Sequence, residues 1–523
     1  MRVAGSRRSS ADGRKELALP VTNPFVHDLR FTPWQKLQIG VMTLTLFPIR
    51  LFVAASMMLL AWPFAFIATM GRSEEAVEPQ CLWRRVVDII LRTIMRVMWF
   101  AGGFHWISVK GRQALPAEAP ILTLAPHSSY FDAMPVTMTM ATIVMKAESK
   151  DIPLWGTLIK YIRPVFVSRS DQDSRKKTVE EIKRRAHSGG EWPQIMIFPE
   201  GTCTNRSCLI TFKPGGFIPA VPVQPVVIRY PNKLDTITWT WQGPGAFKIL
   251  WLTLCQFHNE FEIEFLPIYT PSEEEKRNPP LFAHNVRRLM AKALEVPVTD
   301  YSFEDCQLAM AKGQFRLPVD TCLLEFAKLV RRLGLKRESS DKLLKEYGKR
   351  ARKLQGQKQT LEEFAQFLDL PMSDVLRDMF ALFDEHEDGT VDIREFVIAF
   401  SVVCRPAKTL ETIKLAFTMF EAEEDGAITE DELACILRTA LGVAELRVSR
   451  LFSAIDVEDS GKLTFEMFRS FAEQRPDFAE EFLYADNAGF WGTPTSSASS
   501  PVSNGFCADF TPSEHHATHK KHD

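Results

Sequence analysis

The chain contains two residues, His127 and Asp132, whose types and spacing could support acid–base chemistry. They follow the apolar run Ile121–Ala125, which predicts a short buried strand. A neutral imidazole is the best general base near neutral pH, and a neighbouring carboxylate can fix its tautomer and stabilise the imidazolium. Positions five apart do not share a helix face, so we expect His127 in a turn and Asp132 in the first turn of the next helix. Ser128 or Ser129 would cap that helix.

Further polar groups occur in the same part of the chain. Arg169 ends an apolar run, and a guanidinium at the end of a strand suits a phosphate. Glu200-Gly201-Thr202 offers a carboxylate, a glycine that lets backbone approach a ligand, and a hydroxyl. Lys213 opens a glycine-rich turn. A surface ion pair for Arg169 and a helix cap for Glu200 are the structural alternatives.

Taken in order, these groups resemble the blocks of the glycerolipid acyltransferase family, which includes the lysophosphatidic acid acyltransferases. The matching stretches are an H-x(4)-D block at 127–132, a block from Gly156 to Arg169, the Glu200-Gly201-Thr202 block, and a proline-bearing block at 222–225. The sequences HSSYFD, EGTCTN and VPVQPV are most similar to those of the branch that acylates lysophosphatidylcholine. The family often has Asp before the second-block arginine, whereas this chain has Ser168, a difference that bears on acceptor choice.

The resemblance implies transfer of an acyl group from acyl-CoA to the free hydroxyl of a lysophospholipid. The implied acceptor is lysophosphatidylcholine, with alkyl-lysolipids as further acceptors. His127 would take the hydroxyl proton and Asp132 would orient its ring. The residues that would seat the glycerol-phosphate part are Arg169, Glu200, Gly201 and Thr202. No cofactor is implied for catalysis, because the thioester is already activated. Two alternatives stay open: lysophosphatidic acid as the main acceptor, and an inactive membrane adaptor that responds to calcium.

The composition is that of an ordinary globular protein with room for two or three domains. Of the 523 residues, 46% are hydrophobic and 24% are charged, and the net charge of −2 gives no general attraction for nucleic acid. The nine cysteines are scattered and form no CxxC pair, so neither a zinc site nor a disulfide framework is predicted.

Alternating apolar runs and helical stretches over 107–311 predict an α/β acyltransferase domain with a mixed sheet. We expect strands at 107–109, 121–124, 165–167, 195–198, 223–229 and 261–265, and helices at 133–140, 173–187 and 281–295.

A membrane-embedded segment is predicted ahead of this domain, at 37–70, where Arg50 is the one charged residue. The twenty residues after it are uncharged and long enough to cross a hydrocarbon layer of about 30 Å. Pro48 and Pro63 interrupt the segment, so a single span and a re-entrant hairpin with Arg50 reaching the interface are both open.

The next segment, 71–106, contains a helical pattern at 82–100 in which arginines alternate with apolar residues. This pattern is typical of a basic amphipathic helix on an anionic membrane surface, and a core-packing helix with a solvated basic side fits it equally well. The arginines are Arg84, Arg85, Arg92 and Arg96.

An all-helical domain is predicted over 312–486, because calcium-loop patterns start at 384, 421 and 456 between apolar flanks. The expected calcium ligands are Asp384, Asp388, Asp392 and Glu395 in the first loop and Glu421, Glu423, Asp425 and Glu432 in the second. His386 is a poor ligand in the first loop, and Met467 removes the bidentate carboxylate of the third. The alternative is a structural EF-hand module that binds little calcium.

The two ends of the chain are polar. Residues 1–36 form a basic lead, and 487–523 are rich in Gly, Ser, Thr and Pro, which predicts disorder. Lys520 and Lys521 resemble a di-lysine retrieval signal, so the endoplasmic reticulum membrane is the expected location, with Golgi or lipid droplet as alternatives. The side of the membrane that the active site faces stays open.

Overall fold

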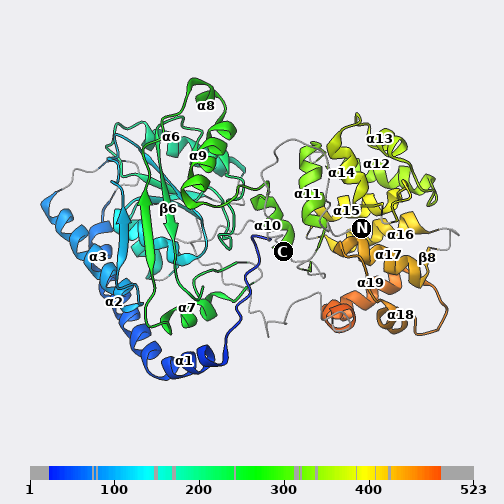
Figure 1. The fold of residues 1–523 in the computed structure, drawn as a ribbon, viewed down its shortest axis with the longest axis horizontal. Helices are drawn as coiled ribbons and strands as arrows, with labels where there is room; N and C mark the ends of the chain where they lie inside the picture. Colours follow the sequence, from blue (N-terminus) through cyan, green and yellow to red (C-terminus); the bar gives the residue numbers. More distant parts are fainter. Residues whose placement is uncertain are drawn as a thin grey trace, which may run out of the picture. The chain divides into compact units, whose positions relative to one another are not determined.

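The computed structural model divides the chain into two compact units, one ending at Phe303 and the other beginning at Glu304 (Figure 1). It describes residues 23–72, 76–77, 81–146, 151–152, 154–167, 172–240, 243–310, 317–318, 321–335, 340–384, 386–406, 408–421 and 426–484. The predicted domain boundary at 311–312 and the predicted disordered tail lie outside these residues.

The first unit is built on a mixed sheet, which confirms the predicted α/β class. Its described strands are β1 (Ile107–Lys110), β2 (Ile121–Ala125), β3 (Thr142–Lys146), β4 (Val165–Val167), β5 (Ile195–Ile197), β6 (Val223–Arg229) and β7 (Phe261–Phe265). They lie in the order β1-β7-β6-β2-β5-β3-β4, and β6 and β7 form the antiparallel pair among otherwise parallel neighbours. Strands β2 and β6 are almost wholly apolar because both of their faces are buried.

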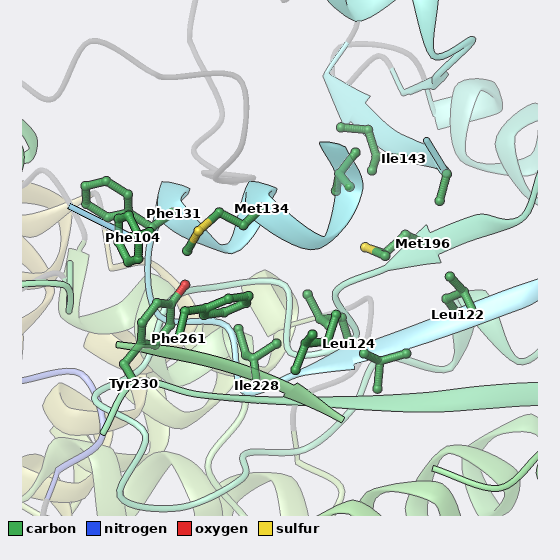
Figure 2. Packing of buried hydrophobic residues seen from close by; sticks show 14 of the residues in the cluster. Phe104, Leu122, Leu124, Phe131, Met134, Ile143, Met196, Ile228, Tyr230 and Phe261 are labelled. Carbon is green, nitrogen blue, oxygen red and sulfur yellow. The ribbon is translucent and has the colours of Figure 1, made fainter. Parts of the chain in front are cut away.

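Helices cover both faces of the sheet and hold its strand ends in place. They are η1 (Tyr130–Ala133), α4 (Met134–Thr139), α5 (Trp155–Tyr161), α6 (Gln172–Ala186), α7 (Ala246–Leu254), α8 (Glu273–Arg277) and α9 (Pro279–Leu294). On one face Leu124 and Ile228 pack with Phe131 and Met134, the first residues after the His127 turn (Figure 2). On the other face Val223 packs with side chains of α6 and α9. The predicted strands and helices are present to within about two residues at each end, whereas β3, α5, α7 and α8 were not predicted.

The predicted membrane segment consists of two helices, α1 (Pro33–Leu44) and α2 (Leu46–Thr69), with the break at Thr45. The predicted interruption at the prolines is wrong. Pro48 lies in the first turn of α2, where no hydrogen bond from its nitrogen is needed, and α2 continues through Pro63. Within the described residues, α2 is the helix that is long and apolar enough to cross a membrane.

Arg50 does not reach outward as expected. Its side chain is buried and donates hydrogen bonds to the main-chain oxygens of Leu254, the last residue of α7, and Phe257, at 3.0 and 2.9 Å. The hairpin alternative placed Arg50 at the membrane interface, whereas carbonyl groups distant in sequence supply its partners.

The predicted amphipathic helix is α3 (Leu82–Ala101), which packs Leu91 and Ile94 against alanines of α2. Several of its large apolar side chains are exposed, as the membrane-surface alternative predicts. Arg92 donates to the main-chain oxygen of Met138 in α4, and Arg96 donates to that of Phe104, just after α3. The exposed apolar residues of α3 are Leu82, Trp83, Val86, Ile89, Val97 and Phe100. An outward apolar face fits lipid contact better than a solvated basic face does.

The second unit is almost wholly helical around a cluster of phenylalanines that includes Phe326, Phe364 and Phe396. Its helices are α10 (Phe303–Met310), α11 (Leu323–Arg332), α12 (Ser340–Lys353), α13 (Leu361–Leu368), α14 (Asp374–Ala381), α15 (Ile393–Cys404), α16 (Thr409–Phe420), α17 (Glu430–Leu441), α18 (Ser449–Ile455), α19 (Phe465–Gln474) and η4 (Ala479–Tyr484). Short antiparallel strands β8 (Ala427–Ile428) and β9 (Leu463–Thr464) join the second and third calcium-type loops. A bridge between Gln359 and Val391 joins the first loop to the α12–α13 turn, so α12 and α13 form an additional hand that lacks acidic loop residues.

Candidate active site

The predicted catalytic residues lie at the edge of the sheet where parallel strands end. His127 follows β2, Glu200 follows β5 and Tyr230 follows β6, and these three strands are neighbours. Since parallel strands present their carboxyl ends at one edge, residues far apart in sequence meet there.

His127 and Asp132 form a buried pair. The Nδ1 atom of His127 lies 2.8 Å from Oδ2 of Asp132, and the two side chains are 4% and 0% exposed. Asp132 lies in the 3-10 turn η1, which Ser129 caps through a hydrogen bond from the Phe131 nitrogen. The predicted geometry, a histidine in a turn and an aspartate in the first helical turn, is therefore present. With the shared proton on Nδ1, the His127 nitrogen with a lone pair to accept a proton is Nε2.

Donors without charge surround Asp132. Its Oδ2 atom also accepts the main-chain nitrogens of Ser128 at 2.6 Å and Ser129 at 3.0 Å, and its Oδ1 atom accepts the hydroxyl of Tyr230 at 2.7 Å. These donors are all uncharged, so the charge of the buried carboxylate remains available to stabilise the imidazolium of His127.

Glu200 has partners inside the protein. Its carboxylate is fully buried and accepts the main-chain nitrogens of His127 at 2.7 Å and Ile210 at 3.4 Å. Burial raises the pKa of Glu200 to about 7, and the hydrogen bond from His127 opposes that rise. The expected role was to seat the acceptor, whereas these contacts join the loop after β5 to the loop that holds His127.

Of the other predicted acceptor-seating residues, Gly201 lies beside Lys213. Gly201 has a φ of +70°, a conformation that favours glycine, and a Cβ atom there would lie 2.9 Å from Cε of Lys213. Thr202 follows in the same loop and is half-buried. The ammonium of Lys213 lies 3.4 Å from the ring centre of Phe303. Arg169 lies outside the described residues.

Two side chains that the sequence did not point to complete the surroundings of the pair. Tyr230 binds Asp132, and the guanidinium of Arg206 lies 5.1 Å from the Tyr230 ring centre and 3.4 Å from the Ser128 hydroxyl. Arg206 also pairs with Asp235 at 2.6 Å. The available signal for Tyr230 was its place directly after a buried strand, on the edge where His127 was expected.

The first calcium-type loop has carboxylates that bind cationic side chains. Asp384 accepts the main-chain nitrogens of Asp388 and Gly389, which closes the loop. Asp388 pairs with Lys358 at 2.9 Å, and Asp392 pairs with Arg394 at 2.7 Å.

Among the described residues, no three His, Cys, Asp or Glu side chains gather as a metal site would require. Glu395 accepts a bond from Thr439 at 3.4 Å, Glu421 accepts one from Gly426, and Glu432 caps its own helix through Thr429. Glu423 and Asp425 lie outside the described residues.

Comparisons with known proteins agree with the two-unit organisation. The acyltransferase family model matches residues 106–229, and the model of an EF-hand domain pair matches residues 424–475. Lysophosphatidylcholine acyltransferase 1 of Homo sapiens is 67% identical over 99% of this chain and 97% of its own length. The protein of the same name from Danio rerio is 69% identical over 94% of each chain. Lysophosphatidylcholine acyltransferase 2 of Mus musculus is 50% identical over 88% of this chain and 85% of its own length.

The α/β unit with its buried His–Asp pair is thus the domain of an acyltransferase. The whole chain belongs to the lysophosphatidylcholine acyltransferase family, and in this chain an EF-hand pair follows the enzyme domain in sequence.

Proposed function

We propose that this protein transfers an acyl group from acyl-CoA to the free hydroxyl of lysophosphatidylcholine, which yields phosphatidylcholine. The observation that supports this most directly is the His127–Asp132 pair, buried at 2.8 Å at the carboxyl edge of the sheet. The choice of acceptor follows the names of relatives that match nearly the full chain.

In the proposed reaction, Nε2 of His127 takes the proton of the acceptor hydroxyl as that oxygen attacks the thioester carbonyl. A carbon–oxygen ester bond forms, the carbon–sulfur bond breaks, and the imidazolium returns its proton to the leaving CoA thiolate. Asp132 holds the ring and stabilises its positive charge. Arg169, Gly201 and Thr202, together with Lys213, would bind the phosphate and glycerol of the acceptor. Glu200 would hold the main chain of His127 and contribute to the acceptor site through the loop that it joins.

The membrane contact that we propose runs along α1, α2 and α3. Arg50, near the start of α2, and Arg72, just beyond its end, both bind main-chain oxygens of the α/β unit. The 24 residues of α2 cover about 36 Å, so a folded domain follows nearly its whole length. This favours a helix embedded from one side of the bilayer over a single span, and exposed apolar side chains such as Phe52 and Ile67 would contact lipid.

An impermeant thiol reagent tests this placement in sealed vesicles. With the other cysteines replaced, a cysteine substituted for Arg30 and the exposed native Cys81 should be labelled from the same face. Labelling from opposite faces would show a span. We further propose the endoplasmic reticulum as the compartment, on the strength of the C-terminal lysines.

Replacement of the histidine tests the reaction. His127→Ala should reduce acyl transfer to background, whereas His187→Ala, at an exposed histidine after α6, should leave it unchanged. Both are assayed as purified full chains with acyl-CoA and either lysophosphatidylcholine or lysophosphatidic acid. Turnover retained by His127→Ala would refute the proposed base, and faster use of lysophosphatidic acid by the wild type would refute the proposed acceptor.

We also propose that the EF-hand unit binds calcium through the loops that begin at Asp384 and Glu421. The carboxylates of both loops are the oxygen ligands that calcium prefers. Calcium binding to the first loop must displace the ion pairs that Asp388 and Asp392 form with Lys358 and Arg394. Calorimetric titration of the full chain with calcium measures this directly, and the absence of binding at millimolar calcium would favour a purely structural module.

A further inference from the structure

Tyr230 connects the catalytic pair to a distant strand. It is the first residue after β6, 98 positions from Asp132 in sequence, and its hydroxyl donates a hydrogen bond to Oδ1 of Asp132 at 2.7 Å. The other close donors to Asp132, Nδ1 of His127 and the main-chain nitrogens of Ser128 and Ser129, lie within five residues of it. Tyr230 therefore restrains the carboxylate from outside its own loop.

The two oxygens of Asp132 have different partners. Oδ2 accepts His127 and the two main-chain nitrogens, whereas Oδ1 accepts Tyr230 at 2.7 Å and the Ser128 hydroxyl at 3.4 Å. A carboxylate held at both oxygens cannot rotate about its terminal bond without breaking one set of hydrogen bonds. The fixed carboxylate in turn orients the imidazole of His127, because Nδ1 of the ring is hydrogen-bonded to Oδ2.

The phenol ring is itself fixed. Tyr230 is 7% exposed, its ring centre lies 5.1 Å from that of Phe261, and the Arg206 guanidinium lies 5.1 Å from it. Asp235 anchors that guanidinium at 2.6 Å. Burial raises the pKa of Tyr230 well above its ordinary value, with a further rise from the charge of Asp132, so the hydroxyl remains a donor across the working pH range.

We propose that Tyr230 is a positioning residue for acyl transfer, which fixes the carboxylate of Asp132 so that His127 presents Nε2 to the acceptor hydroxyl. This inference rests on the proposed function. It also has an electrostatic consequence. The hydroxyl draws negative charge toward Oδ1, and its removal strengthens the attraction of Asp132 for the imidazolium, so the proton leaves His127 at higher pH.

Tyr230→Phe removes the donor and retains the ring. Because a hydrogen bond to a charged group contributes about 1.5–3 kcal/mol, we expect kcat to fall about tenfold or more, with KM for acyl-CoA unchanged. The acid limb of the pH profile should move to higher pH. Tyr269→Phe is the matched control, since the Tyr269 hydroxyl also donates to a carboxylate, Glu275, at 2.6 Å, away from the catalytic pair.

A second replacement guards against a folding defect. Incorporation of 3-fluorotyrosine at position 230 preserves packing and strengthens the donor, so it should move the acid limb to lower pH, opposite to Tyr230→Phe. Identical pH profiles and kcat values for the wild type and both replacements would overturn the proposal.

A spectroscopic measurement separates this inference from the proposed function. The ¹⁵N shifts of the His127 ring in the detergent-solubilised full chain, assigned with His127→Ala, should show the Nδ1–H tautomer in the wild type and in Tyr269→Phe. Titration of these signals in Tyr230→Phe should show the imidazolium of His127 persisting to higher pH than in the wild type. If no variant transfers acyl groups but this displacement appears, the proposed function fails and the positioning role stands. If the wild type turns over and Tyr230→Phe matches it in rate and in the titration of His127, the positioning role fails alone.

Discussion

The α/β unit and the EF-hand unit both contain carboxylates that their sequence patterns mark as functional, and they surround them differently. Asp132 is fully buried and held by uncharged N–H and O–H donors. Asp388 is 40% exposed and pairs with Lys358, which holds the pKa of Asp388 well below its ordinary value. A buried carboxylate with neutral donors keeps its charge for a reaction partner, whereas an exposed one beside a cation has part of its charge compensated.

A motif identifies residue types, and the neighbouring residues decide how the charge of those residues is used. In the enzyme unit, uncharged donors hold Asp132, and its charge stabilises the imidazolium of His127. In the EF-hand unit, Lys358 and Arg394 occupy carboxylates that calcium would need.

The largest effect is expected for a substitution at Asp132 in the enzyme unit. Asp132→Asn removes the charge and places an amide against main-chain donors, so His127 loses its fixed tautomer. We expect kcat to fall about 10³- to 10⁴-fold with little change in KM for acyl-CoA, measured on the purified full chain. Asp28→Asn, at an exposed aspartate paired with Arg30, is the control. A loss below tenfold would show that Asp132 is not the partner of the base.

An effect of intermediate size is expected on the pH dependence of stability, through the buried carboxylate of Glu200. Its pKa in the folded protein, about 7, lies above the ordinary value, so the stability that it contributes is full below about pH 4.5 and is lost as the pH rises through 7. Glu200→Gln does not titrate. The free energy of unfolding of the wild type, taken relative to that of Glu200→Gln, should therefore fall by up to about 3 kcal/mol between pH 5 and pH 8.

Calorimetric unfolding at several pH values measures this difference. Glu191→Gln, at an exposed glutamate, should show no such dependence. A difference for Glu200→Gln that stays constant from pH 5 to pH 8 would contradict the raised pKa of Glu200.

The smallest effect is expected for a substitution at Lys358 in the EF-hand unit. Lys358→Met removes the cation that competes for Asp388, and an exposed ion pair of this kind contributes little because water screens it. Calcium should therefore bind the first loop about two- to fivefold more tightly, measured by calorimetric titration, while Lys349→Met on α12 leaves the affinity unchanged. Equal affinities for wild type and Lys358→Met would show that this pair does not limit calcium binding.

Much of the fold was predictable because its signals are local. The strand before His127 is a continuous apolar run, and the cap by Ser129 involves residues within four positions of one another. Strand β3 was missed for an equally local reason. The chain turns there at Met140, which has a φ of +53°, a conformation that glycine or asparagine would have signalled and methionine does not.

By itself, the sequence determined the α/β and EF-hand units, the family, and the pair His127 and Asp132, since each depends on residue types at short, regular spacing. The tertiary structure alone decided which distant residues serve that pair. Tyr230 and Glu200 reach it because parallel strands bring their carboxyl ends together, and Arg50 turns inward because carbonyls some 200 residues away accept its bonds. No spacing along the chain encodes those contacts, because strand order and register create them.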